Sequence, residues 1–393
     1  GCPGELIGTY RPAYLYVPEE QAGEYEGETV LEGYGYSLLR TAYPTEIPLY
    51  EELALLLTTS GSTGSPKLVR QSYQNIQSNA ESIAQYLKLD STERPITTLP
   101  MNYTYGLSIV NSHVWKGAAV LLTTKTLFDK EFWEFFQEEK ATSFGGVPYT
   151  YEMLKRLRFF PHGSAEPADD DPGGREALAG APQGIRGVRE AGGQAVRGDY
   201  GQTEATARMA YLPPERSLEK YGSMGIAIPG GSFILADVDG KPITQPDVVG
   251  ELVYEGPNVT LGYALAQEDL AKGDERGGRL VTGDMARMDA DGYFYIVGRK
   301  KRFLKIYGNR VNLDEAERLV KAAFEEWDCA CTGVDDHMDV YITSPKEEDR
   351  EKTAEFLAEK TRLNPKAFTV WSIEKIPKNE AGKTLYKELH PQG

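Results

Sequence analysis

The chain has 393 residues, with 43 Lys and Arg against 59 Asp and Glu, which gives a formal net charge of −16. Its length predicts two or three structural units, and its 40% hydrophobic and 10% aromatic residues argue against wholesale disorder. The acidic balance argues against a general nucleic-acid or anionic-membrane binder, because such proteins rely on basic patches, although it leaves room for a local phosphate pocket.

The first half of the chain alternates strand-like and helix-like segments. Residues 52–59 form a short apolar run that enters a loop of Gly, Ser and Thr, which is typical of a buried strand feeding a turn. Helical periodicity follows over 71–89, and residues 129–140 and 149–158 also look helical, whereas 95–125 alternates strand-like runs with glycine-containing breaks. This alternation predicts an α/β fold.

The second half changes character. Short alternating strands over 232–297 are separated by Asp-Gly and Gly turns, which predicts a β-rich subdomain. After Gly298 the chain becomes basic, and two helix-like stretches follow near 313–326 and 346–362. The change in composition places a domain boundary at 298–302.

Cysteines and histidines are few. Cys2, Cys329 and Cys331 are too few for a disulfide framework and lack the spacing of a zinc site, and the four histidines are scattered. No apolar run approaches the ~18–20 residues that a membrane span needs. We therefore expect a cytoplasmic protein with small-molecule partners, no nucleic-acid partner and no membrane span.

The sharpest motif is a loop dense in glycine and hydroxyl residues between a predicted strand and a predicted helix. Its glycines let backbone N–H groups approach phosphate oxygens, hydroxyls add donors, and a lysine adds charge. A Walker P-loop does not fit, because that motif places Ser or Thr after the lysine and Leu68 follows here. A flexible linker is the remaining alternative. The candidate phosphate-binding residues are Thr59, Ser60, Gly61, Ser62, Thr63, Gly64 and Lys67.

This loop resembles the phosphate loop of the adenylate-forming superfamily, which includes acyl-CoA synthetases, peptide-synthetase adenylation domains and luciferases. Further segments similar to the family's motifs follow in the same order. They are Tyr200-Gly-Gln-Thr-Glu204, Gly250-Glu-Leu with Gly262-Tyr263, Thr282-Gly-Asp284, Gly298-Arg299 with Lys305 and Gly308-Asn-Arg310, and the segment from Pro377 to Lys383. Six short motifs in one order are far more specific than any one of them.

The resemblance implies an enzyme that uses ATP and Mg²⁺ to join a carboxylic acid to AMP with release of pyrophosphate. In such a transfer, catalysis is mainly positioning and charge stabilisation. The resemblance implies that the glycine-rich loop cradles the β- and γ-phosphates, that Glu204 holds Mg²⁺, and that Thr203 contacts the α-phosphate. Tyr200 belongs to the nucleotide site, and Asp284 and Arg299 are expected at the ribose.

The resemblance also implies two domains that move relative to each other. The adenylation domain would comprise residues 1–298, a hinge 299–301 with Lys301 at the pivot, and a small α+β lid domain 302–393. Lys383 would reach the α-phosphate and the acyl carboxylate during adenylation, and would swing out when the lid rotates. The pivot is often Asp in the family, so Lys301 is a departure.

The expected substrate is an acyl or aryl acid. Members that activate amino acids usually carry an Asp in the segment matching 99–106, and this sequence has none there, which disfavours a free α-amino acid. For Tyr103 and Tyr105 in this segment, core packing is the alternative to substrate contact. The expected pocket residues are Tyr103, Tyr105, Gly145, Gly146 and Val147. The acceptor would be the thiol of CoA or of a carrier protein.

Two alternatives to catalysis by such a ligase remain open from the sequence. One is an inactive relic or a nucleotide-binding module without catalysis, which would bind ATP without releasing pyrophosphate. The other is luciferase-type oxidation, but nothing in the sequence marks a luciferin pocket.

Two features depart from the family pattern. The family has a much longer stretch before the phosphate loop, so we expect the chain to lack part of its N-terminal subdomain. Residues 163–199, rich in Gly and Pro, occupy the place of a strand, a Gly-Gly loop, a helix and a strand entering Tyr200. Because Glu166–Glu176 and Val196–Asp199 can be encoded so that a shifted frame restores family-like strands, we hypothesise an out-of-frame translation. A disordered insertion and genuine divergence are the alternatives. Each apolar side chain lost from a central strand is worth roughly 1.5–3 kcal/mol when buried, so folding of this chain would be weakened.

Overall fold

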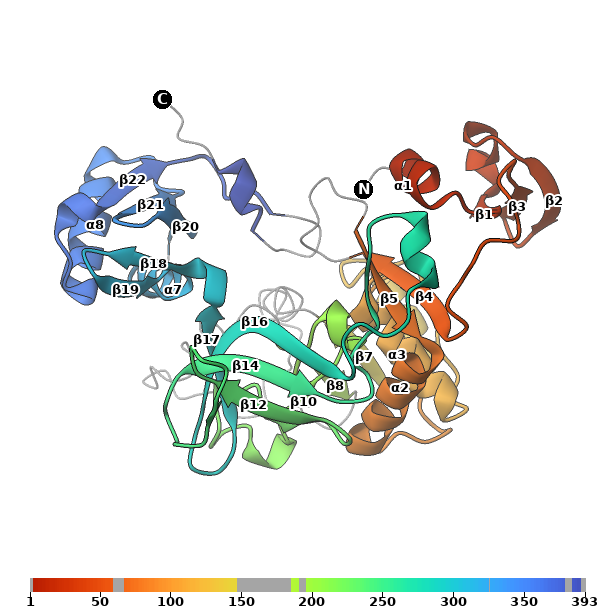
Figure 1. Ribbon diagram of the computed structural model, residues 1–393, viewed down its shortest axis with the longest axis horizontal. Helices are drawn as coiled ribbons and strands as arrows, with labels where there is room; N and C mark the ends of the chain where they lie inside the picture. The colour runs from red at the N-terminus through yellow and green to blue at the C-terminus, as the bar shows by residue number, and fades with distance from the viewer. Residues whose placement is uncertain are drawn as a thin grey trace.

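The computed structural model describes residues 3–58, 67–146, 185–190, 196–324, 326–378 and 384–389. The fold is α/β, as predicted, with helices and sheets distributed over a central body and two lateral parts (Figure 1). The N-terminal residues form one lateral part and the residues after β17 form the other (Figure 1). No helix among these described residues is long and apolar enough to cross a membrane.

The N-terminal part is a short helix followed by a small antiparallel sheet. Its elements are α1 (Pro3–Tyr10), β1 (Tyr14–Pro18), β2 (Glu28–Gly33) and β3 (Tyr36–Arg40), with the strand order β1-β3-β2. A second small sheet begins the body with the order β15-β5-β4. Its strands are β4 (Leu53–Thr58), β5 (Leu68–Ser72) and β15 (Gly262–Ala264). Strands β4 and β5 flank the predicted phosphate loop, which lies outside the described residues except for Lys67.

A six-stranded sheet with the order β11-β10-β9-β8-β7-β6 forms the middle of the body. Its strands are β6 (Pro95–Ile96), β7 (Ser143–Gly146), β8 (Ile185–Glu190), β9 (Val196–Tyr200), β10 (Ala210–Tyr211) and β11 (Ile226–Ala227). Two of these strands come from the unusual segment 163–199, and β9 leads directly into Tyr200. The remainder of that segment lies outside the described residues.

Three helices accompany this sheet: α2 (Tyr73–Leu87), α3 (Thr104–Trp115) and α4 (Lys130–Glu138). A capping box of Ser72 and Asn75 starts α2, and Lys88 in the left-handed conformation ends it. The prediction of strand-like runs through 95–125 was wrong over α3. Tyr105, Ile109 and Ser112 are buried on one face of this helix, which packs against α2, so tertiary burial overrides the β preference of its residues. The helix predicted over 149–158 lies outside the described residues.

The β-rich subdomain predicted over 232–297 is a five-stranded antiparallel sheet with the order β13-β12-β14-β16-β17. Its strands are β12 (Ser232–Ala236), β13 (Pro242–Ile243), β14 (Gly250–Glu255), β16 (Arg279–Met288) and β17 (Phe294–Arg299). The Asp-Gly turns appear where expected, with Gly240 at φ +79° and Gly292 at φ +83°.

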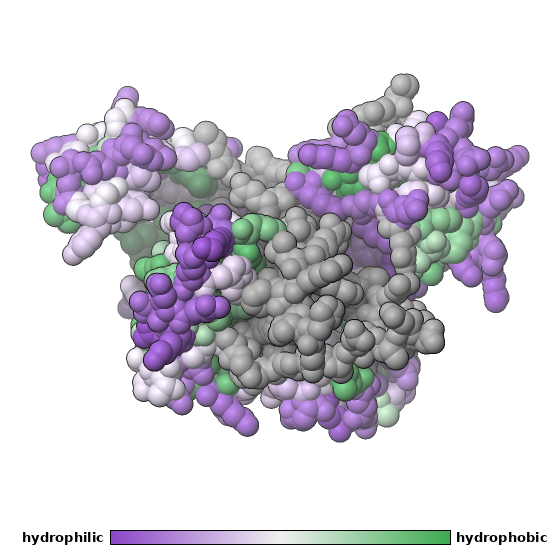
Figure 2. Space-filling model, turned by 180° about the vertical axis from the view of Figure 1, so that it is seen from behind, coloured by the Kyte–Doolittle hydropathy of each residue, from purple (hydrophilic) through white to green (hydrophobic). Residues whose placement is uncertain are grey.

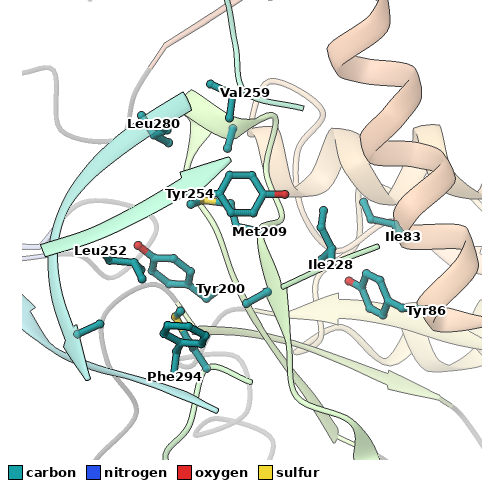
Figure 3. Packing of buried hydrophobic residues seen from close by; sticks show 14 of the residues in the cluster. Ile83, Tyr86, Tyr200, Met209, Ile228, Leu252, Tyr254, Val259, Leu280 and Phe294 are labelled. Carbon is teal, nitrogen blue, oxygen red and sulfur yellow. The ribbon is translucent and has the colours of Figure 1, made fainter. Parts of the chain in front are cut away.

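One hydrophobic core joins this sheet to the six-stranded sheet and to α2. Figure 3 shows Tyr200 beside Leu252 and Phe294, and Ile83 and Tyr86 of α2 near Ile228. The two sheets therefore pack against one core, which matters for the side chains at the end of β9 and in the middle of β16.

After β17 the chain forms a second core of its own. The elements are a 3₁₀ turn (Lys300–Arg302), β18 (Phe303–Ile306), β19 (Asn309–Asn312), α7 (Leu313–Ala323), β20 (Cys329–Val334), β21 (His337–Ile342), α8 (Glu347–Thr361), β22 (Phe368–Ser372) and a last 3₁₀ turn (Tyr386–Glu388). Helices α7 and α8 confirm the two helix-like stretches of the sequence. Where described residues are visible from behind, the surface is largely hydrophilic, in keeping with the net charge (Figure 2).

Candidate active site

A buried carboxylate, Asp284, lies where the five-stranded sheet meets the end of β9. The Tyr200 hydroxyl donates a hydrogen bond to Asp284 Oδ2 at 2.5 Å, and Gln202 Nε2 donates to the same oxygen at 2.9 Å. Gln202 Nε2 also donates to the Thr282 carbonyl at 3.1 Å, which fixes the orientation of its amide. Asp284 is 5% exposed and Tyr200 is 2% exposed. The first and third positions of the Tyr-Gly-Gln-Thr-Glu motif thus converge on the Asp of the Thr-Gly-Asp motif.

Arg299 faces the same carboxylate from the neighbouring strand. Asp284 and Arg299 are register partners of β16 and β17, and Arg299 Nε lies 3.4 Å from Asp284 Oδ1. About half of the Arg299 side chain, 49%, is exposed, so its guanidinium borders both the carboxylate and solvent. This arrangement places one charge-bearing donor and one acceptor side by side at the surface of a buried cluster.

Burial sets the electrostatics of this cluster. Desolvation raises the pKa of Asp284 above its ordinary value, although Arg299, Tyr200 and Gln202 favour the ionised form. Burial, followed by the nearby Asp284 charge, raises the pKa of Tyr200 well above its ordinary value. Tyr200 is therefore a neutral hydroxyl donor, and Asp284 is the acceptor to which it is tied.

A second carboxylate, Glu204, lies one step further along the same motif, in a short 3₁₀ turn (Thr203–Ala205). The Tyr263 hydroxyl of β15 donates to Glu204 Oε1 at 2.8 Å. Burial and the Glu204 charge raise the pKa of Tyr263 to about 12, so it remains a donor. Lys67 Nζ lies 3.4 Å from the centroid of the Tyr263 ring, a cation–π contact. Tyr263 therefore brings the lysine of the phosphate loop and the predicted metal-binding Glu204 to one place.

The backbone of Glu204 is held as firmly as its side chain. Its carbonyl oxygen accepts from the Thr260 amide at 3.0 Å, from the Thr260 hydroxyl at 2.9 Å and from Arg276 Nη1 at 3.1 Å. The guanidinium group of Arg276 also contacts the Tyr263 ring, with its Cζ 4.6 Å from the ring centroid. A glycine is required at 262, because its φ is +135° and a Cβ there would lie 2.5 Å from a Glu275 carboxylate oxygen.

Three residues of this site had no role assigned by sequence reasoning. Gln202 fills the variable position of its motif, and Tyr263 is the tyrosine of the Gly-Tyr motif, so motif position could have identified both. Arg276 lies in an acidic loop with no recognisable pattern, and only the fold brings it to Glu204. Thr203, the predicted α-phosphate contact, is partly exposed and directly precedes Glu204.

The chemistry of Glu204 fits a magnesium ion. Mg²⁺ prefers one or two carboxylates together with water and substrate phosphates, rather than a full set of protein ligands. Glu204 is partly exposed, and the cationic Lys67 beside it suits phosphate oxygens. Among the described residues there is no group of three or more His, Cys, Asp or Glu that could hold a metal alone.

The predicted acyl pocket gathers around the start of α3. Gly145 of β7 touches this helix closely, since a Cβ there would lie 2.3 Å from Ile109 Cδ1 and 3.6 Å from Tyr105 Cε1. Tyr105 is fully buried, with the Arg208 guanidinium carbon 4.9 Å from its ring centroid, so it serves as core packing. Tyr103 occupies the N-cap position of the helix without a side-chain capping bond and is partly exposed, and Gly146 follows Gly145 in the strand.

Several predicted residues stand apart from these clusters or outside the described chain. Lys301 lies exposed in the 3₁₀ turn after β17, between Arg299 and the C-terminal part. Outside the described residues lie Thr59, Ser60, Gly61, Ser62, Thr63, Gly64, Val147 and Lys383.

Similar sequences are found among known proteins. The family model described as AMP-binding enzyme matches residues 12–264. A 2-succinylbenzoate–CoA ligase of Geobacillus kaustophilus (strain HTA426) is 32% identical over 351 residues, which span 86% of this chain and 69% of that protein. An oxalate–CoA ligase of Arabidopsis thaliana is 31% identical over 274 residues, which span 68% of this chain and 52% of that protein.

A solved structure has the same fold. The O-succinylbenzoate coenzyme A synthetase of Bacillus subtilis in complex with AMP superimposes with a TM-score of 0.65 at 23% identity. The match covers 87% of this chain and 70% of the other.

Proposed function

The chain belongs to the family of AMP-binding enzymes, and from this premise we propose that it is an ATP-dependent acid–CoA ligase. It activates a carboxylic acid as an acyl- or aryl-adenylate with release of pyrophosphate, and then transfers the acyl group to the thiol of coenzyme A. The relatives named above are CoA ligases for acids with a second acidic group or an aromatic ring, which supports an acyl or aryl acid as substrate.

The observation that carries the proposal is the Asp284 cluster. A carboxylate held by Tyr200 and Gln202 on one oxygen is an acceptor whose direction is fixed before ligand arrives. We assign Asp284 to the two ribose hydroxyls of the nucleotide, and the half-exposed Arg299 to the ribose edge. The rigid junction of two sheets beneath them limits the motion of this site.

The Glu204 cluster would bind the phosphates. Lys67 supplies positive charge at the end of the phosphate loop, and Thr203 supplies a hydroxyl next to Glu204. Glu204 would hold the magnesium ion, which neutralises phosphate charge when bound. Tyr263 holds the side chain of Glu204 and Arg276 holds its backbone carbonyl, so the carboxylate keeps one orientation.

We further propose the predicted division of the chain, with an adenylation domain to 298, a hinge at 299–301 and a lid domain from 302. Lys383 would enter the active site for adenylation and leave it for thioester formation. Lys301 would absorb the rotation, and its exposure in a short 3₁₀ turn between two strands supports that role.

We place the enzyme in the cytoplasm. Cys329 and Cys331 are buried free thiols in the core of the C-terminal part, a state that a reducing compartment preserves.

The test is exchange of labelled pyrophosphate into ATP, measured over a panel of aryl, fatty, dicarboxylic and amino acids, with Lys383→Ala as control. We expect exchange with at least one aryl or acyl acid, no exchange with free α-amino acids, and CoA-dependent release of AMP with the accepted acid. ATP binding without exchange for any acid would favour a nucleotide-binding module and contradict the proposal.

A further inference from the structure

The C-terminal part contains a buried trio of side chains that the functions assigned above do not use. Glu317 of α7 forms an ion pair with Arg302, and its other oxygen accepts from the Tyr386 hydroxyl at 3.2 Å. The guanidinium carbon of Arg302 lies 3.9 Å from the centroid of the Tyr386 ring. The side chains of Arg302 and Glu317 are only 13% and 6% exposed. Each member of the trio therefore contacts the other two.

The trio joins segments that are far apart in the sequence. Arg302 directly follows the predicted hinge, Glu317 lies in α7, and Tyr386 lies in the last 3₁₀ turn. The Cys331 amide donates to Glu317 at 2.8 Å, which ties the trio to strand β20 as well. The last turn is thus attached to the core of the C-terminal part and to the residue next to the hinge.

The residues just before the last turn are also held by contacts. Lys378 and Thr384 form an antiparallel β-bridge, and the Leu385 amide donates to the Pro377 carbonyl at 2.8 Å. Lys378 forms an ion pair with Asp328. The chain from 379 to 383 lies outside the described residues, but both of its flanking residues are held in place.

Lys383 is bonded directly to Thr384. Consecutive Cα atoms are about 3.8 Å apart, so whatever fixes Thr384 to Tyr386 limits where Lys383 can be. We infer that Arg302, Glu317 and Tyr386 are positioning residues, forming a brace that ties the turn directly after Lys383 to the residue beside the hinge. This inference rests on the proposed ligase function and adds to it the means by which lid rotation reaches the lysine.

The brace predicts a selective effect. Lys383 acts in adenylation and leaves the site before thioester formation, so loosening the brace would slow the first half-reaction and spare the second. Tyr386→Phe keeps the ring over Arg302 and removes the hydroxyl that donates a hydrogen bond to Glu317. Tyr386→Leu removes the ring contact as well. Thr369→Val is the matched control, because it removes one hydrogen bond, to His337, in the same part of the chain.

The kinetic experiment separates the two half-reactions. Pyrophosphate exchange reports adenylation, and thioester formation from a supplied acyl-adenylate and CoA reports the second step. For Tyr386→Phe we expect about tenfold slower exchange, the usual effect of one hydrogen bond to a charged group, with less than a twofold change in thioester formation. The fall should be in kcat rather than in KM for ATP, and Tyr386→Leu should lose more. Equal losses in both half-reactions, or no loss in either, would overturn the inference.

Amide hydrogen exchange provides a readout that does not need activity. In Tyr386→Phe we expect faster exchange in the peptide containing Leu385 and Leu389, whose amides are hydrogen-bonded, while peptides from β20 to β22 stay unchanged. Thr369→Val should not speed exchange near Leu385. If the wild-type protein shows no pyrophosphate exchange with any acid, the ligase function fails, and amide hydrogen exchange alone then tests the brace. Unchanged amide hydrogen exchange near Leu385 in Tyr386→Phe would reject the brace.

Discussion

The same three side-chain types meet on both sides of the predicted hinge. On one side, Asp284 is contacted by Tyr200 and by Arg299, the first hinge residue, and on the other side Glu317 is contacted by Tyr386 and Arg302. Both carboxylates are buried, and burial raises the pKa of each above its ordinary value. The ligand site and the structural brace of this chain are thus built from the same kinds of side chain.

The two trios differ in the arginine. Arg299 is 49% exposed and stands 3.4 Å from its carboxylate, whereas Arg302 is 13% exposed, is in close contact with Glu317 and lies against the Tyr386 ring. An arginine at the surface can exchange its carboxylate for a ligand at little cost. A buried, stacked arginine cannot, because it would leave Glu317 charged and without its main partner. Exposure of the cation therefore decides which trio binds and which one braces.

The largest effect should come from removing Arg302, with removal of Arg299 as the comparison. Arg302→Met leaves Glu317 buried without its cation, and we expect a loss of about 3–5 kcal/mol in the free energy of unfolding. Arg299→Met removes an exposed partner, and we expect a loss below about 1 kcal/mol. Denaturant unfolding, followed by fluorescence of the tryptophans, measures both.

Reversing this order would break the comparison. If Arg299→Met destabilised the protein as much as Arg302→Met, the trio at Asp284 would be structural and the assignment of Asp284 to the ribose would lose its main support. Nucleotide affinity gives the converse check, because Arg299→Met should weaken AMP binding and Arg302→Met, in the folded protein, should not.

A smaller effect is expected from neutralising the two carboxylates with their amide counterparts. Asp284→Asn loses an acceptor for the ribose hydroxyls, and we expect about 2 kcal/mol weaker AMP binding, roughly a thirtyfold rise in Kd. Glu317→Gln should leave the Kd for AMP unchanged, since its neighbours belong to the C-terminal part. Isothermal titration of AMP into each variant measures this. Equal weakening in both variants would contradict the separation of roles.

Sequence reasoning reached one of these trios and not the other, for a physical reason. Asp284, Tyr200 and Arg299 all lie in short motifs, so the residues could be named in advance, although their convergence depends on strand register between β16 and β17. Arg302 and Tyr386 have no such signal. Their contact requires the chain to return across the core of the C-terminal part, and no local pattern records it.

The unusual segment 163–199 shows the same limit. Strands β8 and β9 occupy the central positions that the family pattern predicted, yet their residues are not the expected apolar ones. At its end Asp199 is 1% exposed and lies 3.0 Å from Arg208, also 1% exposed. Arg208 lies outside the segment, so an apolar residue at 199 would leave that guanidinium without this carboxylate. The nucleotide sequence of the gene decides between frameshift and divergence.

The smallest effect should be the response of stability to pH, and it has the same sign in both trios. A carboxyl group whose folded pKa is raised stabilises the fold below its unfolded pKa, and that contribution is lost as the pH rises through the folded pKa. Burial raises the pKa of both Asp284 and Glu317, so for both the free energy of unfolding should fall as pH rises through this range. Asp284→Asn and Glu317→Gln should each flatten that slope.

Binding of the ribose should respond in the opposite direction, through Asp284. The ionised carboxylate accepts both ribose hydroxyls, whereas the protonated form must donate, so affinity should fall as pH falls through the raised pKa of Asp284. Towards the acid end we expect a few-fold loss of affinity, with a slope of at most about tenfold per pH unit for one proton. Titrations of adenosine, which lacks the phosphate that titrates at about pH 6 in AMP, should show this loss in the wild type and in Glu317→Gln, and not in Asp284→Asn. A pH dependence that survives Asp284→Asn would place the titrating group elsewhere, and would leave the ribose assignment to Arg299 alone.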